Sequence, residues 1–509
     1  MARLHEYQGK ALLKQHGIAV PLGEVVSSPE AAREAAQRLL RGDVKRLILK
    51  VQAWITGRKA RGGVVFVNSP AEAAAHSQKL LSMTFGNFPV TELLIEQAID
   101  IKDEIFVSLS VDDALQAPVL LLDCFGGTGI EDRAATVARL PIDVESGADP
   151  GAVRGVVGNS AIDRSLHERL VETIITLVKV ARQYEARALE INPLVTTVGG
   201  EIMAADCRMT IDDYAVFRHP ELGIEIAREL DHPPTELERI AYKVEEADHR
   251  GTFYFAQLPT DGEKSPRNLI GFHGAGGGGS MMSMDAATNA GFKLANFCDT
   301  SGNPSAAKVY RAARIILAQP DLVGYFGSGS GVASQEQFHS AYGLAKAFIE
   351  LKLDIPAVLR LGGNSEDRAV EILEAAAKLL SAQVQGYKKD DTPEFCAQRF
   401  AMLVRQARDR SWKPRPRSVP DFVGSGYSFP INSGTVWIDA ERCDAAAVAL
   451  LVEHSSGLLR NNNGKPALAV GEEQVASKDS ELIALEIECR RAGKPVVFVD
   501  LPVPGLDAA

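Results

Sequence analysis

The chain has 509 residues, a length that several domains share more often than one. Its 46% hydrophobic content is typical of a globular protein with apolar cores, and a formal net charge of −11 excludes a general nucleic-acid binder, which needs a basic surface. No apolar stretch is long enough to cross a membrane, and the N-terminus lacks the apolar core of a signal peptide, so we expect a cytoplasmic protein.

The cysteines are scattered and form no CxxC pair, so neither a zinc site nor a disulfide framework is indicated. We expect reduced thiols at Cys124, Cys207, Cys298, Cys396, Cys443 and Cys489.

The first element expected is an amphipathic helix within residues 1–20 that ends at His16-Gly17. From about residue 21 to residue 235, strand and helix patterns alternate. The first notable strand is a short apolar run that ends in a cation, Lys50.

A loop rich in glycine and arginine follows this strand and carries Arg58, Lys59 and Arg61. Glycines let main-chain N–H groups approach phosphate oxygens, and the cations neutralise them. The loop has no GxxxxGK[ST] pattern, and taken alone it is equally typical of a surface turn. Two apolar strands over residues 93–107 come next, with Glu96 and Glu104 beside them.

A β-hairpin is expected where two strand patterns flank the turn Val198-Gly199-Gly200. Its register would pair Glu190 with Arg208 and Asn192 with Asp206. Side chains two apart on a strand share a face, so these four would form one polar patch.

The patch has two interpretations. An amide and a carboxylate on a rigid hairpin can hold Mg²⁺ and leave room for phosphate, with an acidic residue beside them for proton transfer or for orienting a phosphoryl acceptor. Alternatively, the patch is a solvated face whose polar residues alternate with core residues.

A domain boundary is expected at Asp231-His-Pro-Pro, because consecutive prolines stop a helix. Beyond residue 236 the pattern strand, glycine loop, helix occurs three times, with the loops at 276–279, 327–331 and 362–364. Such repeats build a doubly wound parallel sheet, and ligands bind at the carboxyl ends of its strands.

The last part of the chain differs in character. Residues 391–432 contain several prolines and glycines and are expected to be a linker. Residues 433–509 are expected to form a small α/β extension, for which an interaction or packing role is favoured over a further ligand site.

In order along the chain, these motifs resemble the β subunits of succinyl-CoA synthetase. The resemblance includes Leu4-His-Glu-Tyr-Gln, Lys50-Val-Gln, Gly57-Arg58, Glu190-Ile-Asn-Pro and Asp206, and continues through Gly274-Ala-Gly, Ala295-Asn-Phe-Cys-Asp, Phe326-Gly and Arg360-Leu-Gly-Gly-Asn. It covers about the first three quarters of the chain. It implies an ATP-grasp domain over residues 1–235 and a flavodoxin-like CoA-ligase domain over 236–390, so that the fold class is α/β with an α+β ATP-grasp part.

The resemblance also implies roles for single residues. Asn192 and Asp206 would bind Mg²⁺, and Glu190 would be the acid/base at the phosphoryl-transfer site, assisted by Lys50 and Arg58. The nucleotide, ATP or GTP, would be contacted by Lys50, Gly57, Arg58, Lys59, Glu96, Ile99 and Glu104. The substrate would be contacted by His273, Gly274, Gly327, Ser328 and Gly329.

The implied reaction needs a partner. ATP would phosphorylate a histidine on a separate α-type subunit, the phosphate would activate a carboxylic acid as an acyl phosphate, and the CoA thiol would displace it. His273 is a possible internal phosphohistidine, but a polar substrate contact or a plain loop histidine is favoured at this position.

Three departures from the family pattern bear on specificity. His273 stands where the family has asparagine, and the loop from Gly327 differs from the family's succinate-side loop. We therefore expect a carboxylate other than succinate. Trp54-Ile-Thr replaces His-Ala-Gly in the phosphate loop, which leaves the nucleotide preference open.

Two rival functions stay open at this point. One is an ATP-grasp ligase that joins a carboxylate to an amine, which the glycine-loop domain after residue 236 disfavours. The other is a non-enzymatic paralogue that binds a synthetase-like partner, which the retention of Lys50, Glu190, Asn192 and Asp206 disfavours.

Overall fold

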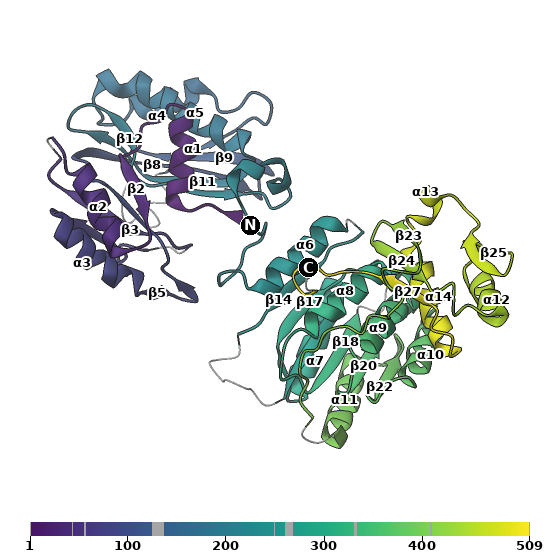
Figure 1. Cartoon of the computed structure of the whole chain (residues 1–509). Coiled ribbons are helices and arrows are strands. Elements are labelled where there is room, and N and C mark those ends of the chain that lie inside the picture. The colour runs from purple at the N-terminus through teal and green to yellow at the C-terminus, as the bar shows by residue number, and fades with distance from the viewer. Residues whose placement is uncertain are drawn as a thin grey trace. The chain divides into compact units, whose positions relative to one another are not determined.

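The structure is a computed structural model that describes residues 2–42, 44–54, 57–124, 137–248, 250–259, 268–329, 333–407 and 410–507 (Figure 1). The chain divides into two compact units, Met1–Pro234 and Thr235–Ala509. The division follows Asp231-His-Pro-Pro, where two prolines remove main-chain donors and prevent a continuous helix.

The first unit begins with a small four-stranded antiparallel sheet whose strand order is β2-β7-β3-β4. Helices α2 and α3 cover one face of it, and each begins at a Ser-Pro pair whose serine hydroxyl accepts a hydrogen bond from the first turn. The elements are β2 (Gly23–Val26), α2 (Pro29–Leu39), β3 (Leu47–Val51), β4 (Val64–Val67), α3 (Pro70–Leu81), β5 (Thr84–Phe85), β6 (Phe88–Pro89) and β7 (Leu93–Gln97).

A larger antiparallel sheet completes the first unit, with the order β1-β13-β11-β8-β9-β10 and β12 paired to β11. Helices α1, α4 and α5 pack against it (Figure 1). The elements are β1 (Ala2–Arg3), α1 (Glu6–Gln15), β8 (Ile101–Asp112), β9 (Ala117–Asp123), β10 (Ala138–Pro141), α4 (Pro150–Gly158), α5 (His167–Gln183), β11 (Ala186–Thr197), β12 (Ile202–Ala204) and β13 (Arg208–Ile211), and the short 3₁₀ turns are Arg164–Leu166, Val216–Arg218 and Pro220–Leu222.

The predicted hairpin register is confirmed. Thr196 pairs with Ile202 next to the turn, and Glu190 pairs with Arg208 farther along. Gly200 has a φ of 81°, the left-handed conformation that a tight turn needs and that glycine adopts without a steric cost.

The second unit contains a mainly parallel sheet with the order β14-β17-β15-β18-β20-β22. Its parallel strands follow the flavodoxin-like order 2-1-3-4-5, so the topological switch point lies between β15 and β18. The elements are α6 (Glu236–Ala247), β14 (Tyr254–Gln257), β15 (Leu269–Ala275), α7 (Gly277–Asn289), β16 (Lys293–Leu294), β17 (Asn296–Asp299), α8 (Ala306–Ile316), β18 (Gly324–Gly329), β19 (Ala333–Glu336), α9 (Phe338–Glu350), β20 (Ala357–Arg360), β21 (Gly363–Asn364), α10 (Glu366–Ala377), β22 (Val384–Tyr387) and α11 (Pro393–Ala407).

Both faces of this sheet are buried, as a doubly wound fold requires. Phe326 packs toward α7 and α11, whereas its neighbour Tyr325 packs toward α8 and α9, and both are 0% exposed. Successive side chains of a strand point to opposite faces, so one strand supplies both cores.

The expected linker over residues 391–432 differs from what the structure has. Helix α11 occupies its first part, and Cys396 and Phe400, one helical turn apart, are fully buried against the sheet. Trp412 is also fully buried, and its indole N–H donates to the Leu317 main-chain oxygen at 2.6 Å. The prolines indicated a linker, but the helical spacing of the apolar residues in α11 and the buried Trp412 fix this segment to the second unit.

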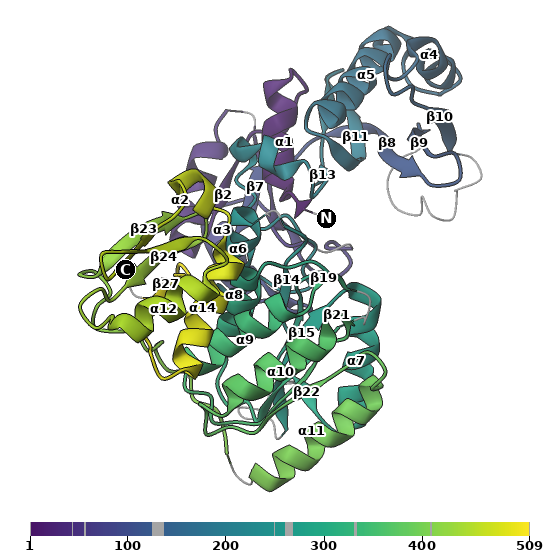
Figure 2. The same ribbon diagram turned by 90° about the vertical axis from the view of Figure 1, so that its right-hand side faces the viewer.

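The C-terminal extension joins the core of the second unit. It forms an antiparallel sheet, β23-β24-β27, and its helix α14 packs against α8, α9 and α10 (Figure 2). The elements are β23 (Tyr427–Ile431), β24 (Gly434–Ile438), α12 (Ala445–His454), β25 (Leu459–Asn462), β26 (Lys465–Leu468), α13 (Glu472–Val475), α14 (Asp479–Arg491) and β27 (Val497–Asp500).

Buried charges fix the extension in place. Glu486 on α14 lies 2.6 Å from the Nζ atom of Lys346 on α9, which also lies 2.5 Å from Glu350. All three side chains are at most 1% exposed. Such a triad requires α14 and α9 to meet at one register, because a shift would leave buried charges unpaired.

Among the described residues, no helix has both the length and the apolar content needed to cross a bilayer.

Lys346→Met tests the role of this triad. It leaves two buried carboxylates without their shared cation, so we expect the second unit to lose about 3–5 kcal/mol of unfolding free energy. Urea unfolding followed by fluorescence measures this loss, since two of the three tryptophans, Trp412 and Trp437, lie in this unit. Lys494→Met removes an exposed pair with Asp444 and is the matched control. Equal midpoints for the two variants would contradict a structural role for the triad.

Candidate active site

A buried ion-pair network lies between α1, β3 and β7 in the first unit. The Glu6 carboxylate lies 2.8 Å from the Nζ atoms of both Lys10 and Lys50. Glu96 also contacts both lysines, at 2.8 Å from Lys10 and 2.6 Å from Lys50. Each lysine further donates to the Ala205 main-chain oxygen, at 2.9 and 2.8 Å. The network therefore fixes the β12–β13 connection beside the Lys50 side chain.

Arg58 extends this network from the loop after β3. Its guanidinium lies 2.8 Å from Glu6 and 3.1 Å from Asp206, and it donates to the Val51 main-chain oxygen at 3.1 Å. Three cations and three carboxylates thus meet in one cluster, here called the Glu6 network: Glu6, Lys10, Lys50, Arg58, Glu96 and Asp206.

The charges of the Glu6 network shift one another's pKa values. Burial raises the pKa of Glu6, but the charges of Lys10, Lys50 and Arg58 outweigh burial and hold this pKa far below its usual range. Burial and the nearby Glu6 charge raise the pKa of Asp206, and the cations offset only part of this rise. Lys50 stays charged, because its carboxylate neighbours outweigh burial and raise its pKa.

The hairpin brings its predicted metal ligands alongside this network. The main-chain N–H of Ala205 donates to the Pro193 oxygen at 3.1 Å, so Asp206 lies across the ladder from Asn192. Glu190 is two residues before Asn192 on β11, and all three polar side chains are half-buried.

This donor set fits a magnesium ion that arrives with phosphate. Asn192 and Asp206 offer an amide oxygen and a carboxylate, the hard oxygen ligands that Mg²⁺ prefers. Within the described residues, no group of three or more His, Cys, Asp or Glu side chains is arranged to hold a metal. An ion held by these two residues would therefore take its remaining oxygen ligands from phosphate or water, as Mg²⁺ commonly does.

The remaining predicted nucleotide contacts lie on several elements of the first unit. Gly57 has a φ of 68° and begins the exposed turn that contains Lys59. Ile99 lies in the connection between β7 and β8, and Glu104 pairs with Val195 of β11. The Glu96 carboxylate is engaged by lysines, so its side chain acts within the protein.

A separate cavity of about 200 Å³ lies in the first unit, lined in part by Arg3, His5 and Trp54. The His5 and Trp54 rings are stacked with centroids 5.0 Å apart, and Arg3 donates to the Trp54 main-chain oxygen at 3.2 Å. This is where the phosphate loop departs from the family sequence, at Trp54, and the departure builds an aromatic wall.

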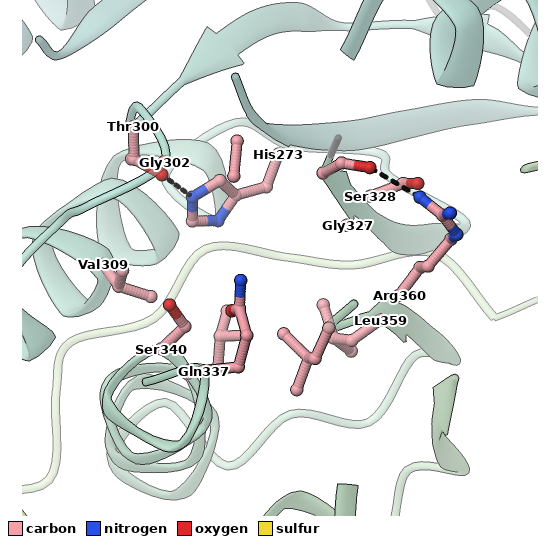
Figure 3. A pocket seen from close by; sticks show the side chains of 14 residues that line it. His273, Thr300, Gly302, Val309, Gly327, Ser328, Gln337, Ser340, Leu359 and Arg360 are labelled. Carbon is pink, nitrogen blue, oxygen red and sulfur yellow. Dashed lines mark hydrogen bonds between the residues drawn. The ribbon is translucent and has the colours of Figure 1, made fainter. Parts of the chain in front are cut away.

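In the second unit, the predicted substrate contacts meet at the carboxyl ends of the parallel strands. His273, Gly327, Ser328 and Gly329 line one cavity (Figure 3). Gly274 lies next to His273, and a Cβ atom there would approach Ser280 Oγ to 2.2 Å, so close packing accounts for this glycine.

His273 is held by a directional chain of hydrogen bonds. The Thr300 hydroxyl lies 3.3 Å from the Gly274 main-chain oxygen and donates to it, so it accepts from His273 Nε2 at 3.1 Å. His273 Nδ1 then accepts from the Tyr325 hydroxyl at 2.6 Å. Burial lowers the pKa of His273 to about 4, and the ring is neutral at physiological pH.

The same cavity has no free cation among the residues that the structure describes around it. Arg360 lines it, but its guanidinium donates to the main-chain oxygens of Gly329, Lys389 and Asp391 at 2.6, 2.7 and 2.6 Å. The cavity volume of about 40 Å³ holds about three water molecules.

Sequence reasoning did not single out several residues of these sites. Glu6 and Lys10 lie one helical turn apart on the buried face of α1, with Gly9 and Leu13. A charged pair inside an apolar stripe was the available signal. Thr300 contacts the His273 ring and the Gly274 main-chain oxygen, and Arg360 contacts three main-chain oxygens, which are partners that the sequence does not reveal.

The comparisons with known proteins agree with this architecture. An ATP-grasp domain model matches residues 3–196. The β subunit of the GDP-forming succinate–CoA ligase of Thermus thermophilus is 34% identical over 399 residues, which cover 75% of this chain and 99% of the relative. The β subunit of the ADP-forming enzyme of Ignicoccus hospitalis is 33% identical over 381 residues, or 73% and 94% of the two chains.

Among solved structures, ATP citrate lyase from Methanothrix soehngenii, in complex with citrate and coenzyme A, has the same fold. It aligns with a TM-score of 0.63 and 19% identity, over 80% of this chain and 99% of that one. The sequence identity and the coverage of these relatives show that this chain is related to the β subunits of succinate–CoA ligases. The chain belongs to the family of succinate–CoA ligase β subunits, and it is a β-type member of the NDP-forming acid–CoA ligases.

Proposed function

We propose that this chain, with an α-type partner, catalyses acid + ATP (or GTP) + CoA → acyl-CoA + NDP + phosphate. The observation that carries the proposal is the meeting of Lys50, Arg58 and Asp206 in one network, across the hairpin from Asn192. Phosphoryl transfer needs charge neutralisation and in-line positioning more than covalent help, and this cluster would supply the charge neutralisation and help to position the phosphates.

Each residue has a distinct part in this proposal. Lys50 and Arg58 neutralise the polyphosphate, and Lys50 is held in place by Glu6 and Glu96. Asn192 and Asp206 would hold Mg²⁺, which when bound neutralises the charge on the phosphate oxygens. Glu190, on the same strand as Asn192, would move a proton or orient the phosphoryl acceptor.

The other proposed nucleotide contacts lie on the connection after β7 and on β8, and on the turn after β3. Ile99 and Glu104 would contact the nucleotide from the first group, and Gly57 and Lys59 would contact its phosphates from the second.

The phosphoryl acceptor would be a histidine of the partner subunit. His273 is unsuited to this task, because it is 7% exposed and both ring nitrogens already have hydrogen-bond partners. It instead positions the loops at the ends of β15 and β17.

The acid would be a carboxylate other than succinate. The described part of the substrate-side cavity offers a neutral His273 and an Arg360 already committed to three main-chain oxygens. A second carboxylate buried there would lack a counter-ion, which is unfavourable.

Asp206→Asn and Glu190→Gln test the nucleotide site. In the complex with the α-type partner, we expect each substitution to slow phosphate transfer from labelled ATP to the partner by about 10²–10⁴-fold. This is the usual effect on the rate of removing an acid–base or charge-stabilising group, about 10²–10⁴-fold. Glu201→Gln removes an exposed carboxylate on the same hairpin and should stay close to the wild-type rate. Wild-type rates in both site variants would refute the assignment.

Thioester formation by the same complex tests the acid. We expect another carboxylic acid to give a higher kcat/KM than succinate. The proposal on the acid is wrong if succinate is the best substrate by a wide margin, whereas the proposal on the reaction would survive that result.

The pKa of His273 predicts a pH dependence. In the unfolded chain His273 takes up a proton near pH 6.5, whereas in the folded chain its pKa is about 4. The free energy of unfolding therefore falls as pH falls from about 6.5 to about 4. The loss amounts to about 3 kcal/mol. His273→Asn removes this titrating group. The difference in unfolding free energy between wild type and variant, measured by urea titration, should therefore become smaller from pH 7 to pH 4.

His454→Asn makes the same substitution at an exposed histidine and is the control for the substitution itself. A gap for His273→Asn that does not change with pH would show that the buried ring is not the titrating group.

A further inference from the structure

Arg58 is shared between two carboxylates with different surroundings. Glu6, 1% exposed, keeps Lys10 and Lys50 as partners whether or not Arg58 is present. Asp206 is 34% exposed, and both of its carboxylate oxygens face the guanidinium, at 3.1 and 3.2 Å. Its Oδ1 also accepts the main-chain N–H of Cys207 at 2.8 Å.

This geometry conflicts with a metal on the same carboxylate. The Arg58 nitrogen that contacts both oxygens takes one lone-pair site on each, and the Cys207 N–H takes another on Oδ1, so a single site on Oδ2 is left for a divalent cation. Two cations on one carboxylate also repel each other, so Arg58 and the metal compete for Asp206.

We propose that Arg58 is the counter-ion of Asp206 in the nucleotide-free protein, and that a divalent cation binds Asp206 by displacing this guanidinium. The inference rests on the proposed function, since it takes Asp206 as a metal ligand. Glu6 retains the displaced Arg58 within the site through its other ion pair, and the polyphosphate offers the guanidinium new acceptor oxygens.

Coupling between the two ligands follows from this exchange. Without nucleotide, the metal must break the Arg58–Asp206 pair, so it binds weakly. When nucleotide is bound, its phosphates give Arg58 another partner. The metal then binds the protein–nucleotide complex more tightly than it binds the free nucleotide. By linkage, the metal tightens nucleotide binding by the same factor.

The test is Mn²⁺ binding to the isolated, nucleotide-free chain, measured from the electron paramagnetic resonance signal of free Mn²⁺. Mn²⁺ takes the same oxygen ligands as Mg²⁺. We expect Arg58→Gln to bind Mn²⁺ roughly tenfold more tightly than wild type, the effect of losing one partly buried ion pair. Arg61→Gln makes the same charge change on an exposed arginine of the same loop and should change the affinity less than about twofold, because solvent screens its charge.

A second substitution locates the effect. Adding Asp206→Asn to Arg58→Gln should abolish the gain in affinity, since the freed carboxylate is then absent. Arg58→Lys keeps a positive charge but cannot span both carboxylates, so it should fold if Arg58→Gln does not and should give a smaller gain.

The inference is overturned if neither Arg58 variant gains affinity, if Arg61→Gln gains as much, or if the gain persists without Asp206. These outcomes leave the proposed function intact as long as phosphate transfer to the partner still requires Asp206. Loss of that requirement would instead remove the proposed function.

Discussion

The ion pairs around Glu6 are the constraint on which the first unit depends. Two lysines from different elements, Lys10 and Lys50, bridge the same two glutamates and the Ala205 carbonyl. Burying this many charges is costly unless every one is paired. Any other packing of the helix, the small sheet and the hairpin would leave charges unpaired, so one arrangement is favoured. Because its charge must be paired in this buried site, the Lys50 side chain has a defined position, which solvent-exposed ion pairs would not give it. The same cluster then serves the chemistry, since its cations face the carboxylate that would carry the metal.

The second unit uses a different device to define its site. Strand order places the ends of β15 and β18 at a switch point, where the helices leave on opposite faces and a cavity forms. Neutral hydrogen bonds through His273 and Thr300 set the loops there, and Arg360 holds the end of β18 through Gly329. Because the polar groups satisfy one another, the described part of this cavity offers uncharged hydrogen-bonding groups. The extension stabilises the scaffold from the far side of α8 and α9.

Local patterns predicted much of the fold. The hairpin register followed from one glycine turn, and the doubly wound parallel sheet followed from three strand–glycine loop repeats, because both depend on short-range chain geometry. The helix over Pro393–Ala407 was missed, since prolines farther along outweighed an apolar period in the same segment. Glu6 and Lys10 were missed because most of their partners are distant in sequence: Lys50 meets Glu6, and Glu96 and Ala205 meet Lys10, only after two sheets have packed. Charges on a buried helix face are the sequence signal that such a long-range network leaves.

The claim that Lys50, Arg58, Asn192 and Asp206 form one site for a metal–nucleotide complex is tested most directly by a crystal structure with Mg²⁺ and a non-hydrolysable ATP analogue. The account predicts Mg²⁺ at about 2.0–2.1 Å from oxygens of Asn192 and Asp206, with Lys50 and Arg58 on the phosphates. A nucleotide bound elsewhere, with Asp206 still paired to Arg58, would contradict it.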